Sequence, residues 1–313
     1  MALPRDDLAP LQGPYPDWFK AAFEVPRSEG SVEVDGCAIH YFEWGERSAP
    51  PVLMTHGFMA HARVFAFVAP FLASRFHLVS YDLSSMGDSA ARPEPGDRAD
   101  EAMAVAQATG LFDHVQKPIF VAHSFGGTVA IAAAERHPEA FGGLVICDLM
   151  MLREPRLRAM FGGPSPAKDR PPGPRVHKVY PDLPTALDRY RLTPSQPCEN
   201  DFLLEYLAHH SLKAVEGGFR WKFDPSILDH DRRQSRLWAD VPHRFAALGG
   251  RRAIVHGRRS KLFDNDSADY VGELAGPEVP IIGLPEAHHH LMLDQPLAFT
   301  SVLDTLLSVW TAG

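Results

Sequence analysis

Short apolar runs recur along this chain, and segments with helical patterns separate them. Helices cover both faces of a parallel sheet, so its strands are buried on both sides and appear as unbroken apolar runs. The alternation therefore predicts an α/β fold in which helices flank a mostly parallel sheet. The runs that we assign to strands are residues 51–57, 76–82, 118–124, 142–148, 251–257 and 279–285.

The same pattern divides the chain into parts. Residues 31–45 read as two strands around the turn Asp35-Gly36, which is a strong hairpin signal. After Asp148 the alternation stops, and a segment rich in Pro, Arg and aromatic residues follows without strand-like patterning. We therefore expect an irregular leader over 1–30, a core over 30–150 and 236–313, and a mainly helical cap insert over 151–235.

The composition excludes several classes of protein. The chain has 31 Lys and Arg against 39 Asp and Glu, a net charge of -8, so it lacks the basic field used in nucleic-acid binding. No apolar run reaches the length of a membrane span, and the first residues contain no apolar signal region. Three cysteines (Cys37, Cys147 and Cys198) are too few for a disulfide framework. We expect a cytoplasmic monomer or homodimer that acts on a small molecule.

The sharpest local motif is VAHSFGG at residues 121–127, between an apolar run and a helix of small residues. A serine on such a strand-to-helix turn is exposed above the sheet, and the residues two positions away must be small. Ala122 and Gly126 meet that condition. The helix N-terminus behind Ser124 favours developing negative charge. Ser124 is therefore the candidate nucleophile, and the alternative is a serine that only caps the helix.

Two further segments follow earlier predicted strands, THGF at 55–58 and YDLSSMGDS at 81–89. Together with the serine turn, they make the chain resemble the α/β-hydrolase superfamily over residues 30–150 and 240–313. The resemblance implies an oxyanion hole formed by the backbone N–H groups of Phe58 and Phe125. Ser85 stands where the family usually has glycine, so we expect a local change in that turn.

Residues 285–296 resemble the family's closing segment, G-H-x-x-x-x-E-x-P. Counting back seven residues from Pro296 makes His289 the general base, with His288 as the alternative. Three histidines stand in a row here, but three consecutive side chains cannot all face one ion, so we expect no metal site. No dinucleotide or phosphate-loop fingerprint occurs, and we expect no cofactor.

The catalytic acid is where the chain departs from the common pattern. In most members of the superfamily the acid follows the seventh strand, and here Ser260 occupies that place, although serine cannot stabilise an imidazolium as an anion. Asp148, 24 residues after Ser124, resembles the acid after the sixth strand in haloalkane dehalogenases and some small esterases. We favour Asp148 over Asp264 and Asp266, which require the loop to fold back. The alternative interpretation of Asp148 is an N-cap for the first helix of the insert.

These residues predict a serine hydrolase that cleaves a carboxylic ester, lactone or thioester through an acyl-enzyme. The aromatic insert favours an apolar or aromatic substrate. One alternative is hydrolysis of a C–C bond in β-diketones or ring-fission products. Another is a non-catalytic ligand-binding protein, which the serine at the usual acid position, Ser260, favours. A serine nucleophile argues against dehalogenase or epoxide-hydrolase chemistry, which uses aspartate in this superfamily. The residues expected to line the substrate pocket are His56, Gly57, Met59, His123, Met150, Met151 and His288.

Overall fold

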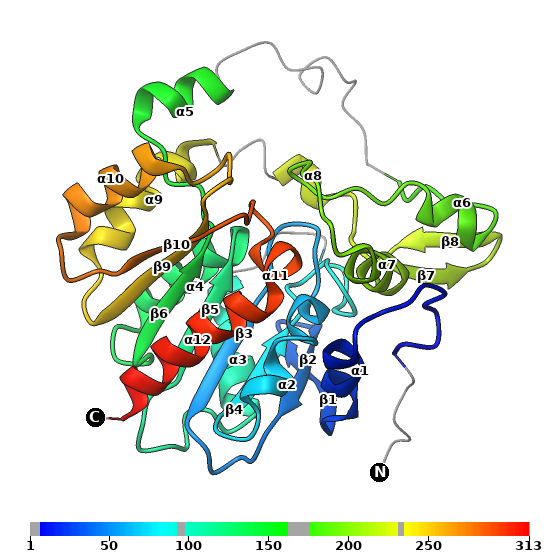
Figure 1. The fold of residues 1–313 in the computed structure, drawn as a ribbon, viewed down its shortest axis with the longest axis horizontal. Helices are drawn as coiled ribbons and strands as arrows, with labels where there is room; N and C mark the ends of the chain where they lie inside the picture. The colour runs from blue at the N-terminus through cyan, green and yellow to red at the C-terminus, as the bar shows by residue number, and fades with distance from the viewer. Residues whose placement is uncertain (1–6, 93–97, 162–175, 231–234, 313) are drawn as a thin grey trace.

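The computed structural model describes residues 7–92, 98–161, 176–230 and 235–312, and an eight-stranded sheet runs through them (Figure 1). Its strands are β1 (Arg27–Val34), β2 (Cys37–Trp44), β3 (Pro51–Thr55), β4 (His77–Tyr81), β5 (Ile119–His123), β6 (Gly143–Cys147), β9 (Arg251–Gly257) and β10 (Ile281–Leu284). Their spatial order is β1-β2-β4-β3-β5-β6-β9-β10. β2 is antiparallel to both of its neighbours, and the pairs from β4 to β10 are parallel. The predicted fold class is confirmed.

The hairpin of β1 and β2 has the predicted turn. Asp35 and Gly36 have φ of +49° and +75°, the left-handed conformation that a two-residue type I′ turn requires of both central residues. In the middle of the sheet β3, β4, β5 and β6 are buried at every residue, as expected for strands covered on both faces.

Two layers of helices cover the sheet, and α12 crosses its front face in Figure 1. Neighbouring strand residues face opposite layers, because side chains alternate along a strand: Met54 joins one core cluster and Leu53 the other. The first layer contains α1 (Asp17–Glu24), α2 (Ala69–Leu72), α11 (Leu291–Asp294) and α12 (Pro296–Thr311). The second contains α3 (Arg98–Ala108), α4 (Phe125–Arg136), α9 (Ser235–Ala247) and α10 (Asn265–Ala275).

The insert contacts loops that follow core strands. Asp224 N donates to Ser85 O, and Lys222 Nζ lies 2.5 Å from Asp88 Oδ1. Ser85 has φ of +64°, a left-handed conformation that favours glycine, and its hydroxyl accepts from Arg92 N at 2.8 Å. The described elements of the insert are α5 (Glu154–Phe161), α6 (Leu183–Leu187), α7 (Asp201–His210), β7 (Leu212–Val215), β8 (Gly218–Trp221) and α8 (Ile227–His230).

The insert, expected to be mainly helical, also contains a short antiparallel hairpin of β7 and β8. Gly217 and Gly218 at its turn have φ of +82° and +140°, which only glycine adopts readily. The sequence Glu216-Gly217-Gly218 carried this turn signal. The strands escaped the alternation test because they are four residues long and half-exposed.

The N-terminal leader is also more ordered than expected. Its residues form α1, which lies beside the cap in Figure 1, and Phe19 of this helix is fully buried. The carboxylate of Asp7 lies 2.7 Å from Arg27 and 2.8 Å from Arg63. His210 of α7 donates to Asp7 O at 3.0 Å, so the leader joins the core to the cap. In the described part of the chain no helix is both long and apolar enough to cross a membrane.

Candidate active site

Ser124 lies on a strained turn between β5 and α4. Its φ of +50° and ψ of −124° form a conformation that residues with side chains rarely adopt. Its N–H donates to Cys147 O at 2.7 Å, which fixes the turn to β6. A Cβ at Gly126 would lie 2.6 Å from His56 O, and one at Gly57 would lie 3.1 Å from Ser124 Cβ. The small residues therefore let the loop after β3 approach the serine closely.

Asp148 and His289 are in hydrogen-bond contact. Asp148 follows β6 with φ of +49°, and its Oδ1 lies 2.8 Å from His289 Nδ1 on the turn between β10 and α11. The same oxygen accepts from Ser260 Oγ at 2.6 Å, and Oδ2 accepts from Gly257 N at 2.9 Å. The side chain of Asp148 has no exposed surface. Ser260, which occupies the usual acid position, thus donates to the carboxylate on the neighbouring strand end.

Burial governs the charges at this contact. It raises the pKa of Asp148, while the donors Ser260 and Gly257 oppose that shift, and it lowers the pKa of His289. A neutral imidazole whose Nδ1–H faces Asp148 has its lone pair on Nε2, the form that accepts a proton. Among the described residues no hydrogen bond joins Ser124 Oγ to His289. Such contacts often tighten only when substrate binds.

The rival acids lie elsewhere. Asp264 caps α10 by accepting from Ser267 N, and its carboxylate lies 2.7 Å from Arg156 Nη2. Asp266 lies 2.8 Å from Arg156 Nη1. Arginine on α5 therefore holds both carboxylates, and Arg156 lowers the pKa of Asp264 to about 2.

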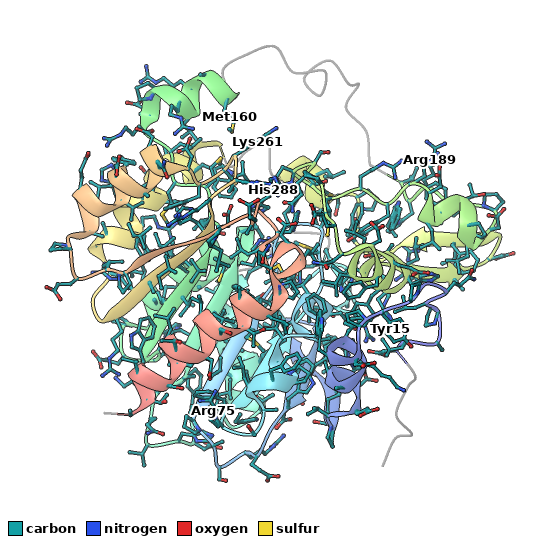
Figure 2. All side chains as sticks on the ribbon, in the orientation of Figure 1. Tyr15, Arg75, Met160, Arg189, Lys261 and His288 are labelled. Carbon is teal, nitrogen blue, oxygen red and sulfur yellow. The ribbon has the colours of Figure 1, made fainter. Side chains whose placement is uncertain are left out.

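His288, the alternative base, faces a different partner from His289. Its Nδ1 lies 3.1 Å from Asp294 Oδ2, and its backbone N–H donates to the same oxygen at 2.6 Å. Figure 2 labels this side chain on the turn that leads into α11. Within the described residues, His289 is the member of the histidine run that contacts Asp148.

Two backbone amides beside Ser124 are available for a ligand. In the described part of the chain neither Phe58 N–H nor Phe125 N–H has a hydrogen-bond acceptor. His56 Nε2 accepts from Leu83 N at 3.0 Å, so its Nδ1 carries the proton and donates to Gly57 O at 2.7 Å. Because a trans peptide holds its C=O and N–H on opposite sides, this bond directs the Phe58 N–H away from His56.

Comparisons with known proteins identify a family for the chain. Residues 52–302 match the Alpha/beta hydrolase family. The chain belongs to this family. The acetyltransferase component of the acetoin cleaving system of Pseudomonas putida is 26% identical over 268 residues, covering 84% of this chain and 65% of that protein. The uncharacterized hydrolase YugF of Bacillus subtilis is 28% identical over 137 residues, covering 41% of this chain and 48% of that protein. The chain thus spans less than two thirds of these relatives.

Solved structures of hydrolases share the fold. E-2-(acetamidomethylene)succinate hydrolase superposes with a TM-score of 0.73 at 20% identity, over 90% of this chain and 100% of that one. An esterase from Mycobacterium tuberculosis has a TM-score of 0.68 at 19% identity, over 98% of this chain and 100% of that one. At these identities the likeness establishes the fold alone.

The protein has a cavity of about 260 Å³ between its core and its cap. Phe58 and Met59 line it from the loop after β3, and Tyr190 and Trp221 line it from the cap. Leu293 of α11 adds to a mostly apolar wall. The cavity therefore extends from Phe58, in the loop after β3, to residues of the insert.

The predicted pocket residues lie in different parts of the structure. Met59 lines the cavity, whereas His56, Gly57 and His123 lie around the Ser124 turn. Met150 and Met151 differ from the prediction, because both are buried in apolar clusters beside β6. His288 also differs, because Asp294 holds it. Adjacent sequence position was a poor guide to pocket lining here.

Two contributions escaped the sequence argument. The sequence marks Ser260 only as a serine at the usual acid position, because its contact as a donor to Asp148 depends on two loops that meet only in the fold. Tyr190 and Trp221 belong to the aromatic set of the insert, and no local pattern distinguishes them from aromatics that pack within the cap.

Proposed function

We propose that this hydrolase cleaves carboxylic esters of apolar small molecules through an acyl-enzyme on Ser124. The observation that carries the proposal is the 2.8 Å contact between Asp148 and His289 at the strand ends that also present Ser124. A buried carboxylate on Nδ1 selects the imidazole tautomer whose Nε2 removes a proton from a serine hydroxyl. The cytoplasmic, small-molecule setting expected from the sequence is part of the same proposal.

The proposed reaction has two halves. His289 Nε2 takes the proton of Ser124 as Oγ attacks the ester carbonyl, and the N–H groups of Phe58 and Phe125 donate to the oxyanion. The imidazolium then protonates the departing alcohol, which leaves the acyl group on Ser124. In the second half His289 deprotonates a water that attacks the acyl carbon, and the imidazolium returns this proton to Ser124 Oγ as the carboxylic acid leaves. Asp148 remains a carboxylate throughout.

The apolar cavity supports an apolar acyl group as the part of the substrate that is recognised. Its wall begins at Phe58, next to the proposed oxyanion donors, so an acyl chain in the cavity would place its carbonyl near Ser124. The relatives named as epoxide hydrolase and carbamate hydrolase show that related chains carry other reactions. Serine at position 124 supports acyl transfer, because epoxide opening in this superfamily uses aspartate.

A fluorophosphonate probe tests the proposal directly. We expect it to label the wild-type protein and Ser301→Ala, whose serine is exposed on α12, and to spare Ser124→Ala. A panel of nitrophenyl esters, thioesters, lactones and vinylogous diketones then assigns the reaction. Equal labelling of Ser124→Ala, or no labelling of the wild type, would show that the assignment is wrong. Turnover of the diketones without ester turnover would indicate C–C bond hydrolysis instead.

A further inference from the structure

Three histidine rings gather where β5 ends and α11 begins. The ring centroids of His123 and His289 are 4.8 Å apart, those of His289 and His290 are 4.9 Å apart, and those of His123 and His290 are 5.5 Å apart. One ring nitrogen of each residue lies within 4.8 Å of a ring nitrogen of the other two. The proposed hydrolysis uses only His289 of the three.

Each ring is oriented through its other nitrogen. His289 Nδ1 lies 2.8 Å from Asp148 Oδ1, His123 Nε2 lies 2.9 Å from His289 O, and His290 bonds the backbone of Thr193. Carboxylate and carbonyl oxygens only accept, so a nitrogen that faces one carries a proton. Each neutral ring then has one nitrogen with a free lone pair. Metal-ligating histidines almost always have this second contact, which fixes the tautomer and the ring plane.

His290 shows that the cluster has an unmet acceptor. Its Nε2 is buried, and within the described part of the chain it has no hydrogen-bond partner. A buried polar atom without a partner costs about 1–3 kcal/mol, so something that binds the lone pair would remove this cost.

We propose that His123, His289 and His290 bind a borderline divalent metal ion such as Zn²⁺, and that the bound ion blocks hydrolysis. Any triangle with sides of at most 4.8 Å has a point within about 2.8 Å of all three corners, and Zn–N bonds are about 2.0–2.1 Å. Small side-chain rotations close that difference. Three histidines leave the fourth tetrahedral position for water, and imidazole nitrogen suits Zn²⁺, Cu²⁺ and Ni²⁺.

The inhibition follows because the ion and the proposed reaction both need His289 Nε2. The ion would occupy the lone pair that His289 needs to take the proton of Ser124, so this part of the inference rests on the proposed function. Metal binding itself does not depend on it. Three consecutive side chains cannot all face one ion, but the proposed site does not require this. His288 contacts Asp294 instead, and the third ligand is His123 of β5.

Equilibrium dialysis against Zn²⁺ tests the site in Ser124→Ala protein, which keeps all three histidines and has no nucleophile. We expect one tightly bound Zn²⁺ per chain. Adding His290→Leu should weaken binding at least ~100-fold, because second-contact changes alone cost 10–100-fold and this change removes a ligand. The matched control is His288→Gln in the same background, which alters the adjacent histidine and should leave Zn²⁺ binding within about twofold.

Two further readouts keep the test decisive. The His288→Gln protein should show the visible absorption of tetrahedral cobalt when it is loaded with Co²⁺. The His290→Leu protein should not show this absorption. If His290→Leu fails to fold, anomalous scattering from Zn²⁺ in crystals of the Ser124→Ala protein should place the ion between the three rings. Three results would overturn the metal site. They are equal Zn²⁺ affinity in Ser124→Ala protein and in folded Ser124→Ala protein that also carries His290→Leu, a Zn²⁺ ion located elsewhere in the crystal, and no Zn²⁺ binding to Ser124→Ala. If Zn²⁺ binds but fluorophosphonate never labels the wild type, the metal site stands and the proposed function fails.

Discussion

At the scale of single residues, three donors converge on the carboxylate of Asp148: His289, Ser260 and Gly257 N. If this carboxylate orients the base, Asp148→Asn keeps the shape but favours the wrong imidazole tautomer. The same change in a serine protease lowers kcat about 10⁴-fold, and we predict a loss of at least ~10² here. Steady-state ester kinetics check this. Asp264→Asn is the comparison and should change the rate less than about tenfold, because Arg156 holds that residue.

Ser260 gives a second prediction at this scale. Its Oγ donates to Asp148 at 2.6 Å and accepts from Leu262 N at 3.1 Å, so the hydroxyl fixes the carboxylate relative to the loop after β9. A hydrogen bond to a charged group contributes about 1.5–3 kcal/mol, and Ser260→Ala should therefore lower kcat at least ~10-fold with little change in KM. Arg259→Ala, at the exposed neighbouring position, is the control. A kcat equal to that of Arg259→Ala would contradict a positioning role.

At the scale of elements, a polar cluster joins the leader, the core and α7. Asp7, Arg63 and Tyr206 are its buried members, and Arg27 and His210 are partly buried. Burial alone would raise the pKa of Asp7, but Arg27 and Arg63 lower it overall. Its stabilising effect is therefore complete above the unfolded pKa of about 4 and is lost as the pH falls through the folded value.

Asp7→Asn leaves two guanidinium groups without their buried partner. We predict a loss of about 3 kcal/mol in the free energy of unfolding at pH 7, and a difference from wild type that shrinks below about pH 4. Thermal melts across this range measure both. Asp17→Asn in the same leader, at an exposed position, should cost less than about 1 kcal/mol. If the difference in free energy of unfolding between the wild type and Asp7→Asn stays constant at low pH, Asp7 does not stabilise the fold through its charge.

The elements show which features a sequence can carry. β3, β5 and β6 were predictable because complete burial leaves unbroken apolar runs, and the turn at Asp35-Gly36 because its left-handed backbone restricts the residues that fit. The hairpin of β7 and β8 is short and half-exposed, so little burial marks its strands. The sequence did not predict α1, because this short amphipathic helix lies in a Pro-rich segment. It packs against α7, which is far away along the chain.

The candidate site divides in the same way. Ser124, Asp148 and His289 each follow a strand of the sheet, so the order of elements was enough to predict that they lie at the same edge of the sheet. Ser260 and His123 have partners that are distant in sequence, Asp148 and the backbone of His289, and these contacts follow only from the fold. Pocket lining was least predictable, because the cap supplies much of the wall.

At the scale of the whole molecule, a mostly apolar cavity lies between the core and the cap, with Phe58 and Trp221 in its wall. Burying a methylene contributes about 0.8 kcal/mol, which is about fourfold in kcat/KM if the transition state keeps the contact. We predict that kcat/KM for nitrophenyl esters rises with acyl length from acetate and levels off once the chain fills the cavity. Leu192→Trp, on the cavity wall, should flatten this rise and leave acetate turnover within about threefold, since a short acyl group does not reach the filled space. A series as steep as that of the wild type would mean that the acyl chain binds elsewhere.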